Sequence, residues 1–357
     1  MTHVVLTGGG TAGHVVPALP IAETLKDQGH QLTWIGTRSG LEERLVSGVV
    51  DDYHGISAGK LRRYLSWKNV QDAFAVLLGV FQALILLRRL RPEVVFSKGG
   101  FVSFPVVFAA WVWRIPVVAH ESDRSPGLAN RLAYPFIRQL CTNFPESQTG
   151  FKGPEQYTGT PIRAALLAGD AQRGRQFLFN GASESTKPVL LITGGSLGAD
   201  RLNAVVIEAL PQLCAEYRVV HLCGPGKMPP LQPLPSDYRP FEYLHEQWGD
   251  VLAAADLVVS RAGANTLFEL LALAKPNLLV PLTLAASRGD QIENAQYAKA
   301  AGYSQVLPEE ALSPESLLAA LADLTAALPD IKQRLAGFER PDATAKICAM
   351  LLECAAV

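Results

Sequence analysis

Short runs of aliphatic and β-branched residues recur along the chain, and each is followed by a longer segment with apolar residues at helical spacing. Within the runs the apolar residues are consecutive, which is typical of strands buried on both faces of a sheet. The predicted strands span residues 3–7, 31–35, 93–97, 116–120, 139–142, 188–193, 218–222, 256–260 and 277–280. Strands that alternate with helices in this way predict an α/β fold with doubly wound parallel sheets.

The two halves of the chain begin alike. In each, the first strand runs into a glycine-rich loop and then a helix, and the loops start at Gly8 and Gly194, 186 residues apart. We therefore expect two Rossmann-like domains that face each other across a cleft, with ligands beyond the carboxyl ends of the strands. The first domain should span 1–161, ending in a turn-rich hinge at 158–161, and the second 162–341. Segments 179–188 and 225–240 are predicted surface loops.

Composition is consistent with this fold and excludes several classes of protein. The length of 357 residues suits two domains. Lys and Arg number 32 against 33 Asp and Glu, so the formal charge of -1 gives no indication of nucleic-acid binding. With 48% hydrophobic and 18% charged residues, the chain is neither disordered nor a coiled coil. The 5 cysteines are scattered, and we expect them to be reduced and buried.

A mean hydropathy of +0.15 is high for a globular protein and raises the question of a membrane. The longest uncharged stretches, 73–87 and 99–113, have 15 residues each, short of the about 20 that a spanning helix needs. The N-terminus also lacks the basic and long apolar regions of a signal peptide. We therefore expect no membrane span.

Segment 60–91 is unlike the rest of the chain in charge. It carries seven basic residues and one acid, a local charge of +6. The basic residues are Lys60, Arg62, Arg63, Lys68, Arg88, Arg89 and Arg91. The apolar residues at helical spacing are Phe74, Leu77, Leu78, Phe81, Leu84 and Ile85. Such a segment suits docking on anionic lipid, and it also suits a core helix with solvated ends.

The first glycine loop, residues 8–14, ends in His14. Glycines let the backbone approach a phosphate closely, and a following helix offers unpaired N–H groups. The loop matches the dinucleotide pattern G-x-G-x-x-G, but the second strand ends in Gly36-Thr37-Arg38, which suits only a phosphorylated ribose such as that of NADP. At a helix start His14 would be neutral and able to act as a general base or a donor, with a structural histidine as the alternative.

Three segments of the second half also follow predicted strands. Ser196 in loop 194–198 would donate to a phosphate, unless the loop is only a tight turn. Glu269 in segment 260–269 would accept both hydroxyls of a ribose, or merely stabilise a helix dipole. Further on, Gln291 and Asn294 share a helix face, and such amides suit either sugar hydroxyls or helix capping.

In the first half, segments 97–103 and 120–127 follow strands and should reach the cleft. Asp123 is the only aspartate at a strand end of this half and is therefore a second candidate base. Metal-ligand spacings and a Gly-x-Ser-x-Gly elbow are absent from the sequence. We expect no metal or other cofactor, with phosphates neutralised by helix N-termini and basic side chains.

Together these segments resemble the MurG family of GT-B glycosyltransferases (family 28), over essentially the whole chain. Members add N-acetylglucosamine to the undecaprenyl-pyrophosphoryl-N-acetylmuramyl-pentapeptide carrier lipid. The residues that carry the resemblance are 9–14 (GGTAGH), 99–103 (GGFVS), 120–121 with 127–130 (HE and GLAN), 194–198 (GGSLG) and 261–264 with Glu269 (RAGA and E). The resemblance implies the GT-B fold, with a last helix, 342–357, that returns to the first domain.

The resemblance also implies roles by position. Thr11, Ala12 and Gly13 would line the donor sugar, and Arg163 and Ser196 would lie near its phosphates. Uridine and ribose would be held by Ala264, Asn265, Thr266, Leu267, Phe268 and Glu269. Gln291 would contact the N-acetylglucosamine and Leu244 the uracil through its backbone. The first domain would bind the acceptor lipid, and its glycine loops would take the lipid pyrophosphate.

Two departures from the family pattern bear on the site. Ser122-Asp123 stands where many members have Gln-Asn, and Asp123 could accept from donor hydroxyls or compete with His14 as base. Ala12 replaces a common glycine, which is tolerated only if its φ is negative.

The implied reaction is an inverting displacement that gives a β-1,4 link (lipid I to lipid II) in peptidoglycan synthesis. A peripheral location on the cytoplasmic side of the cell membrane would follow, with segment 60–91 on anionic inner-leaflet lipid. The enzyme alternatives are a soluble GT-B protein such as a UDP-N-acetylglucosamine epimerase and an NADP-dependent oxidoreductase. A non-catalytic nucleotide-sugar sensor is the further alternative.

Overall fold

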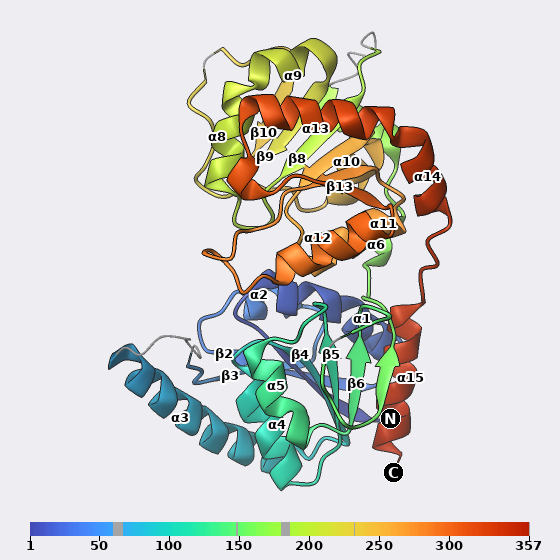
Figure 1. Cartoon of the computed structure of the whole chain (residues 1–357). Coiled ribbons are helices and arrows are strands. Elements are labelled where there is room, and N and C mark those ends of the chain that lie inside the picture. The colour runs from blue at the N-terminus through green and yellow to red at the C-terminus, as the bar shows by residue number, and fades with distance from the viewer. Residues whose placement is uncertain (60–66, 148, 180–185, 232, 357) are drawn as a thin grey trace. The chain divides into compact units, whose positions relative to one another are not determined.

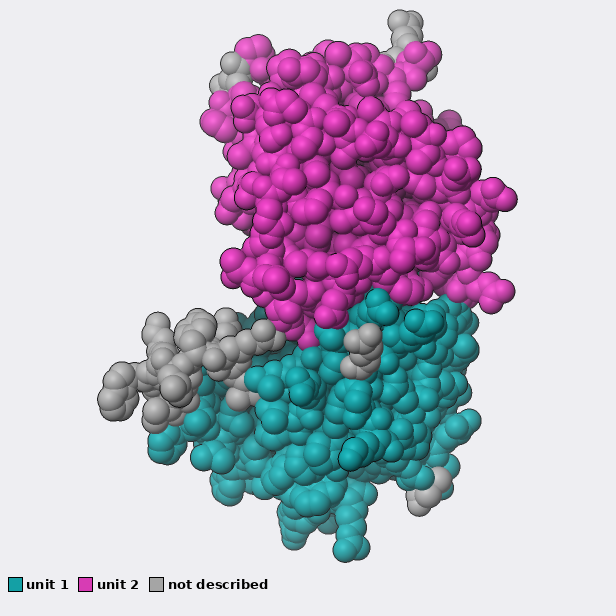
Figure 2. Space-filling view, viewed as in Figure 1, with its two compact units in different colours: residues 1–163, 341–357 teal, residues 164–340 magenta. Residues whose placement is uncertain are grey.

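The computed structural model describes residues 1–59, 67–147, 149–179, 186–231 and 233–356, and of residues 67–71 only the backbone. The chain forms two compact units, residues 1–163 with 341–357 (unit 1) and residues 164–340 (unit 2) (Figure 2). The sequence placed these boundaries after residue 161 and at residue 342.

Unit 1 contains a parallel sheet of 7 strands in the order β3-β2-β1-β4-β5-β6-β7. Its strands are β1 (His3–Gly8), β2 (Gln31–Thr37), β3 (Asp52–Ile56), β4 (Val94–Gly99), β5 (Val117–Glu121), β6 (Gln139–Thr142) and β7 (Glu155–Tyr157). The hydrophobic pattern predicts the five central strands and misses β3 and β7. These two lie at the edges of the sheet and contain polar residues, so they lack a continuous apolar run.

Two helix layers enclose this sheet. The helices of unit 1 are α1 (Leu19–Asp27), α2 (Glu42–Val46), α3 (Trp67–Leu90), α4 (Ser103–Val112), α5 (Leu128–Ala133) and α15 (Ala343–Ala355). Helices α1 and α15 pack on one face of the sheet, and α3 and α4 on the other (Figure 1). Successive strand side chains point to opposite faces, so Val4 belongs to the core on the α1 side and Val5 to the core on the α4 side. The C-terminal helix α15 is thus part of the N-terminal fold.

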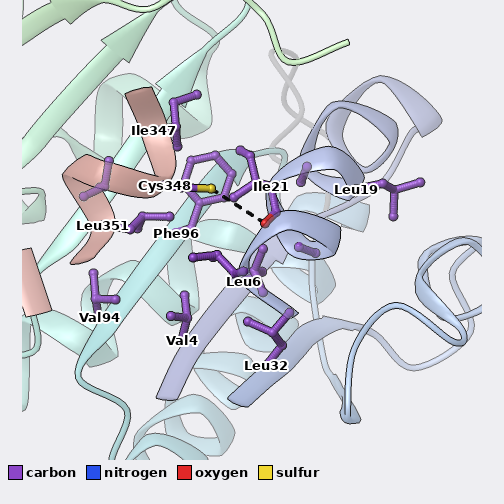
Figure 3. Packing of buried hydrophobic residues seen from close by; sticks show 14 of the residues in the cluster. Val4, Leu6, Leu19, Ile21, Leu32, Val94, Phe96, Ile347, Cys348 and Leu351 are labelled. Carbon is purple, nitrogen blue, oxygen red and sulfur yellow. Dashed lines mark hydrogen bonds between the residues drawn. The ribbon is translucent and has the colours of Figure 1, made fainter. Parts of the chain in front are cut away.

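Figure 3 shows how α15 is held. Ile347, Cys348 and Leu351 pack against Phe96 and Ile21, and Cys348 Sγ donates to the Ile21 carbonyl oxygen at 3.8 Å. All of these side chains are almost completely buried. The core of unit 1 is therefore completed by residues more than 300 positions away in the sequence, since 327 residues separate Ile21 and Cys348.

Unit 2 contains a parallel sheet of 6 strands in the order β10-β9-β8-β11-β12-β13. The strands are β8 (Val189–Thr193), β9 (Arg218–Leu222), β10 (Tyr238–Phe241), β11 (Leu257–Ser260), β12 (Asn277–Leu279) and β13 (Ser304–Val306). The helices are α6 (Ala164–Leu167), α7 (Ala171–Phe179), α8 (Asp200–Glu208), α9 (Leu210–Glu216), α10 (Trp248–Ala254), α11 (Ala264–Ala272), α12 (Asp290–Ala300), α13 (Pro314–Ala326) and α14 (Leu328–Ala336). Strands β10 and β13, again at the edges, were not predicted.

Three local predictions need correction. The first glycine loop leads into two 3₁₀ turns, η1 (Ala12–His14) and η2 (Val16–Ala18), and α1 begins only at Leu19. Pro17 causes this, because it lacks an N–H and its ring would clash with an α-helical carbonyl four residues earlier. Segment 225–240 is not all loop, since β10 begins at Tyr238 and accommodates Pro240 at the sheet edge.

The third correction concerns helix length. Within the described residues, α3 from Asp72 to Leu90 is long and apolar enough for a membrane span by length and composition alone. The sequence count of 15 residues was too short for this helix because it covered only uncharged residues, whereas a helix can carry charges at its ends. Length and composition alone do not decide whether the helix spans a membrane. Only 17% of the apolar window is buried in the structure, so α3 is not an ordinary core helix.

Candidate functional site

Each sheet reverses its strand order at one point, between β1 and β4 in unit 1 and between β8 and β11 in unit 2. Ligands of doubly wound sheets bind beyond the carboxyl ends of the strands at such switch points. The loops at the two switch points begin after Gly8 and Gly99 in unit 1, and after Thr193 and Ser260 in unit 2. These loops, with turn η1 and the start of helix α11 that follow them, contain most of the predicted site residues.

In unit 1 the loops after β1 and β4 touch. The Gly9 N–H donates to the Gly99 carbonyl oxygen at 3.4 Å. Gly100 has a φ of 86°, and a Cβ there would overlap the Gly9 carbonyl oxygen and lie 3.2 Å from His14 Cδ2. His14, the first candidate base, therefore lies beside Gly100, inside turn η1 rather than at an α-helix start.

The segment after β5 joins the same loops through Glu121. This buried carboxylate accepts from the backbone N–H of Asp123 at 3.1 Å and of Gly127 at 3.2 Å. It also accepts from Asn130 Nδ2 at 2.8 Å, and a Cβ at Gly99 would lie 2.8 Å from Asn130 Oδ1. Glu121 thus fixes the turn that carries Asp123, the second candidate base, next to the loop after β4.

Lys98 lies beneath this loop and is completely buried. Because Thr7 pairs with Ser97 and Gly8 with Gly99, Lys98 is the extra residue of a β-bulge, which redirects its side chain. Its Nζ donates to Ser122 Oγ and lies 2.8 Å from His120 Nδ1. Burial lowers the pKa of Lys98 to about 8, opposed by the charges of Glu121, Asp123 and Cys141.

His120 is the neutral partner in this cluster. Burial first, and the nearby Lys98 charge second, hold the pKa of His120 well below its usual value. Its Nε2 bonds to the Gly159 carbonyl oxygen at 2.8 Å. The imidazole therefore joins the bulge to the segment at which unit 1 ends, and its role is structural.

The sequence analysis did not identify Glu42, which belongs to this edge of the sheet. It is fully buried, and its Oε1 accepts from the Gly10 N–H at 2.9 Å. The Thr37 hydroxyl donates to the same carboxylate, with an Oε2 distance of 3.1 Å. The signal in the sequence is an acid shortly after the second strand, within segment 36–43.

Three further unit 1 residues of the expected site belong to the first glycine loop and turn η1. Thr11 is exposed, and Ala12 and Gly13 are half-buried in turn η1. Ala12 is not among the residues with positive φ, so its methyl group meets the condition set by the sequence. Arg163, where the first segment of unit 1 ends, acts electrostatically on Glu23 of α1: burial raises the pKa of Glu23, and the Arg163 charge opposes this rise.

In unit 2 the loop after β8 turns tightly between two glycines. Gly195 and Gly198 have φ values of 82° and 68°. The Gly195 N–H donates to Thr193 Oγ1 at 3.2 Å, and Ser196 between the glycines is exposed to solvent. A Cβ at Gly198 would overlap the Cys223 carbonyl oxygen, so close packing on the loop after β9 also requires glycine there.

Helix α11 begins directly after the loop that follows β11. Its N-cap, Gly263, is extended and supplies no side-chain cap to the first turn. Asn265, Thr266 and Glu269 are half-buried, whereas Leu267 and Phe268 are buried. Phe268 stacks on Tyr297 at 6.5 Å between ring centroids, so the Leu267 and Phe268 side chains serve packing. Ala264 is buried at the helix start, and Leu244 is buried beyond β10.

The two amides of α12 have different surroundings. Asn294 is fully buried and its Nδ2 donates to the Ala262 carbonyl oxygen at 3.1 Å, which ties α12 to the α11 loop. Gln291 is half-buried, and its Oε1 accepts from the Leu282 N–H at 3.1 Å. The hydrogen bonds support the structural reading for Asn294, while Gln291 remains a candidate for a sugar hydroxyl through its amide nitrogen.

A buried ion pair supports the α11 loop from below. Arg261 pairs with Glu309 after β13, and its Nη1 donates to the Val280 carbonyl oxygen at 3.1 Å. Both side chains are less than a tenth exposed. Glu309 was not identified from the sequence, since nothing local marks an acid 48 residues away as a partner.

One cavity of unit 2 lies apart from the predicted residues. Its volume is about 410 Å³, and Asn203, His221 and Lys227 are among its lining residues. Burial lowers the pKa of His221 to about 4, and its ring nitrogens bond to the Tyr238 hydroxyl and Asn203 Oδ1 at 2.9 and 3.0 Å. His221 therefore joins β9, β10 and α8 and is not available for proton transfer.

Among the residues that the structure describes, no group of three or more His, Cys, Asp and Glu side chains could hold a metal ion. The two edges present backbone N–H groups, His14, Asp123, Glu269 and amide or hydroxyl side chains. Such groups suit a phosphorylated sugar nucleotide and a proton transfer.

Comparisons with known proteins decide the family. The glycosyltransferase family 28 N-terminal domain matches residues 4–142, and the glycosyltransferase family 28 C-terminal domain matches residues 189–346. The chain belongs to glycosyltransferase family 28. Its fold is GT-B, and the names of its relatives identify it as an N-acetylglucosamine transferase.

Two relatives of this glycosyltransferase span nearly the whole chain, and both are named UDP-N-acetylglucosamine--N-acetylmuramyl-(pentapeptide) pyrophosphoryl-undecaprenol N-acetylglucosamine transferase. That of Legionella pneumophila (strain Lens) is 46% identical over 353 residues, covering 98% of this chain and 96% of the relative. That of Clostridium kluyveri is 47% identical over 352 residues, covering 98% and 99%. The solved structure of Acinetobacter baumannii MurG matches with a TM-score of 0.77 at 26% identity, covering 99% of this chain and 100% of that one.

Proposed function

We propose that this glycosyltransferase moves N-acetylglucosamine from UDP-N-acetylglucosamine to the C4 hydroxyl of N-acetylmuramyl-(pentapeptide) pyrophosphoryl-undecaprenol. The observation that carries the proposal is the identity of 46% and 47%, over 98% of the chain, to relatives with this activity in their names. The reaction would be a step of peptidoglycan synthesis. The same relatives favour it over an epimerase, an oxidoreductase and a sensor.

The donor nucleotide would bind at the switch point of unit 2. The loop with Ser196 precedes α8 and would receive the diphosphate, because a helix N-terminus and tight glycine turns favour anions. Glu269 would accept from the ribose hydroxyls, and the amide nitrogen of Gln291 would contact the sugar. Negative charge develops on UDP as it leaves, so these donors, with Arg163, would stabilise the transition state.

The acceptor would bind at the switch point of unit 1, where the candidate bases lie. His14 and Asp123 are both half-buried and belong to adjoining segments linked through Gly100, Gly99 and Asn130. Either could remove the proton of the C4 hydroxyl as it attacks the anomeric carbon. Attack on the face opposite UDP would invert α to β.

Helix α3 supports a peripheral location on the cytoplasmic side of the cell membrane. Phe74, Leu77, Phe81 and Ile85 are 71%, 67%, 61% and 54% exposed, an unusual number of large apolar side chains in water. Helix α4 extends this surface: Trp113 donates to the Leu84 carbonyl oxygen at 3.0 Å, and Arg88 lies 5.1 Å from its ring centroid. We call this surface, formed by exposed α3 residues and Trp111, Val112 and Trp113, the apolar patch.

The packing of α3 favours docking of this patch on lipid over a membrane span. Ala83 and Leu87 are buried in the core of unit 1, and a Cβ at Gly79 would overlap the Ser57 carbonyl oxygen. A spanning helix would have to leave these contacts. Arg88, Arg89 and Arg91 lie at one end, where anionic lipid would add about 1 kcal/mol for each; Lys60, Arg62 and Arg63 lie outside the described residues.

Ligand titration tests the proposed class of enzyme. By calorimetry, UDP and UDP-N-acetylglucosamine should bind, and NADPH should not. Glu269→Gln should weaken UDP binding about tenfold or more, because a carboxylate accepts from ribose hydroxyls more strongly than an amide. Binding of NADPH without binding of UDP would contradict the proposal.

Vesicle sedimentation tests the apolar patch. Phe74→Ser with Phe81→Ser should weaken binding to anionic vesicles at least about tenfold, since each ring loses a few kcal/mol of burial. Reversal of Lys60, Arg62 and Arg63 to Glu should weaken it further and only on anionic lipid. Phe177→Ser, an exposed phenylalanine of unit 2, is the matched control. Unchanged vesicle binding by both the phenylalanine variant and the charge-reversal variant would favour the core-helix alternative.

A further inference from the structure

The first glycine loop has the sequence of an anion-binding loop, yet its N–H groups are largely used within the chain. The Gly9 N–H donates to the Gly99 carbonyl oxygen, and the Gly10 N–H donates to Glu42 Oε1 at 2.9 Å. The His14 N–H donates to the Thr11 carbonyl oxygen at 3.1 Å within turn η1. A phosphate at Gly10 would therefore have to displace a buried carboxylate of the same sign.

The surroundings of Glu42 are built around its carboxylate. A Cβ at Gly9 would overlap Oε1, and a Cβ at Gly40 would overlap Oε2 and the Thr37 hydroxyl, so a side chain at either position would displace the carboxylate. Thr37 donates to the carboxylate, and the Tyr53 hydroxyl donates to the Thr37 carbonyl oxygen at 2.6 Å. Burial and then the charges of Glu42 and Glu43 raise the pKa of Tyr53, which places Tyr53 as a neutral donor.

We propose that the Glu42 carboxylate occupies the position that a phosphate would take in the first glycine loop. Glu42 is thereby a positioning residue for Thr11–His14. The inference rests on the proposed function and refines it. The carboxylate holds Gly10 in its left-handed conformation against Phe101, and turn η1 with His14 follows directly. It also keeps free phosphates and the lipid pyrophosphate away from the Gly10 N–H. The pyrophosphate would then bind to other hydrogen-bond donors at the carboxyl edge of the unit 1 sheet.

The hydrogen bond between Glu42 and the Gly10 N–H distinguishes a positioning role from a role in packing alone. Glu42 touches the loop through a hydrogen bond from the backbone, so a small free carboxylate could take its place in a truncated variant. Glu43, the next residue, is exposed and provides a matched control. Glu42→Gln keeps the shape and an acceptor for the Gly10 N–H but removes the charge.

The test compares Glu42→Ala, Glu42→Gln and Glu43→Ala in transfer assays, with sodium formate or the same concentration of sodium chloride. Glu42→Ala should lower kcat at least about tenfold with little change in KM for UDP-N-acetylglucosamine, because a displaced catalytic loop costs turnover. Formate, and not chloride, should restore part of the lost kcat. Glu42→Gln should lose less than Glu42→Ala, and Glu43→Ala should behave as wild type.

Thermal unfolding provides a readout that does not depend on the reaction. Formate should raise the Tm of Glu42→Ala and leave those of wild type and Glu43→Ala unchanged. Unaltered kcat in Glu42→Ala, or no effect of formate on either kcat or Tm, would overturn the inference. Absence of transfer by wild type would instead contradict the proposed function, and the Tm comparison would still decide the role of Glu42.

Discussion

At the scale of single residues, buried charges dominate the carboxyl edge of the unit 1 sheet. Lys98, Glu42 and Glu121 are each less than 5% exposed, and each contacts a loop that carries a predicted site residue. Burying a charge is costly unless it is paired and hydrogen-bonded, so residues of this kind are retained where they position something. These three groups fix the backbone around His14 and Asp123.

Lys98 makes the stability of the protein depend on pH in a defined window. Its pKa is lowered from 10.5 to about 8, with Glu121, Asp123, Cys141 and His120 facing it. Between these values the unfolded chain binds more protons than the folded one, so the free energy of unfolding rises with pH there.

The matching variant is Lys98→Met, which lacks the titration. The difference in unfolding free energy, wild type minus Lys98→Met, should increase by about 3 kcal/mol from pH 8 to pH 10.5 and be constant below the window. Urea unfolding at several pH values measures it. A difference that stays flat through the window would show that Lys98 titrates elsewhere.

The two candidate bases can be separated by turnover. His14→Ala or Asp123→Asn should lower kcat by about 10²–10⁴-fold, the usual contribution of a general base, with little change in KM for the donor. If one of the two residues only binds substrate, its variant should raise KM instead of lowering kcat. If neither variant lowers kcat, the proton is removed by another group.

At the scale of elements, much of the fold was predictable and the exceptions have physical causes. The nine apolar runs all correspond to strands, because strands buried on both faces leave a strong sequence signal. The edge strands β3, β7, β10 and β13 leave none. Pro17 displaces the start of α1 towards the C-terminus. This effect is local, but the glycine-loop pattern alone predicts an earlier helix start.

The candidate site was predictable only in part, for a related reason. Loop residues such as His14, Ser196 and Asp123 follow strands and could be located from the strand pattern. The residues that support the site loops, Glu42 at the first glycine loop and Glu309 at the loop before α11, contact partners 32 and 48 positions away. Long-range pairing of this kind cannot be seen in local spacing.

Contact between the two glycine loops of unit 1 can be tested at Gly100. Gly100→Ala should destabilise unit 1 by about 2 kcal/mol or more, because the methyl group meets the Gly9 carbonyl oxygen in addition to the strain of a positive φ. Gly29→Ala is the control, since Gly29 has a φ of 81° and no atom within 4 Å of its Cβ position. Equal destabilisation of the two variants in urea unfolding would disprove the close contact.

At the scale of the whole molecule, the chain leaves unit 1 and returns to it. Gly159 and Pro341 lie together, since a Cβ at Gly159 would be 2.7 Å from Pro341 Cγ, and α15 then completes the core on the α1 side. Unit 1 therefore cannot attain its full stability until the last helix has been made. Among the described residues, those of the cluster on the α1 side all belong to unit 1.

Leu351→Ala tests the dependence of unit 1 on α15. The variant should lower the unfolding free energy of unit 1 by about 2–5 kcal/mol, because it leaves a cavity in a tightly packed core. The fluorescence of Trp34, in the same core, reports this unfolding. Affinity for UDP should remain unchanged, and Leu324→Ala in unit 2 should show the reverse pattern. Loss of UDP affinity in Leu351→Ala would contradict independent cores.

The transferase assignment itself depends on one reaction. Purified protein, incubated without added metal with radiolabelled UDP-N-acetylglucosamine and the N-acetylmuramyl-(pentapeptide) pyrophosphoryl-undecaprenol lipid, should release UDP and form a lipid-linked disaccharide with a β-1,4 bond. Anomeric configuration is read by nuclear magnetic resonance of the released disaccharide. Hydrolysis or epimerisation of the donor without label in the lipid, or a product with retained α configuration, would contradict the assignment.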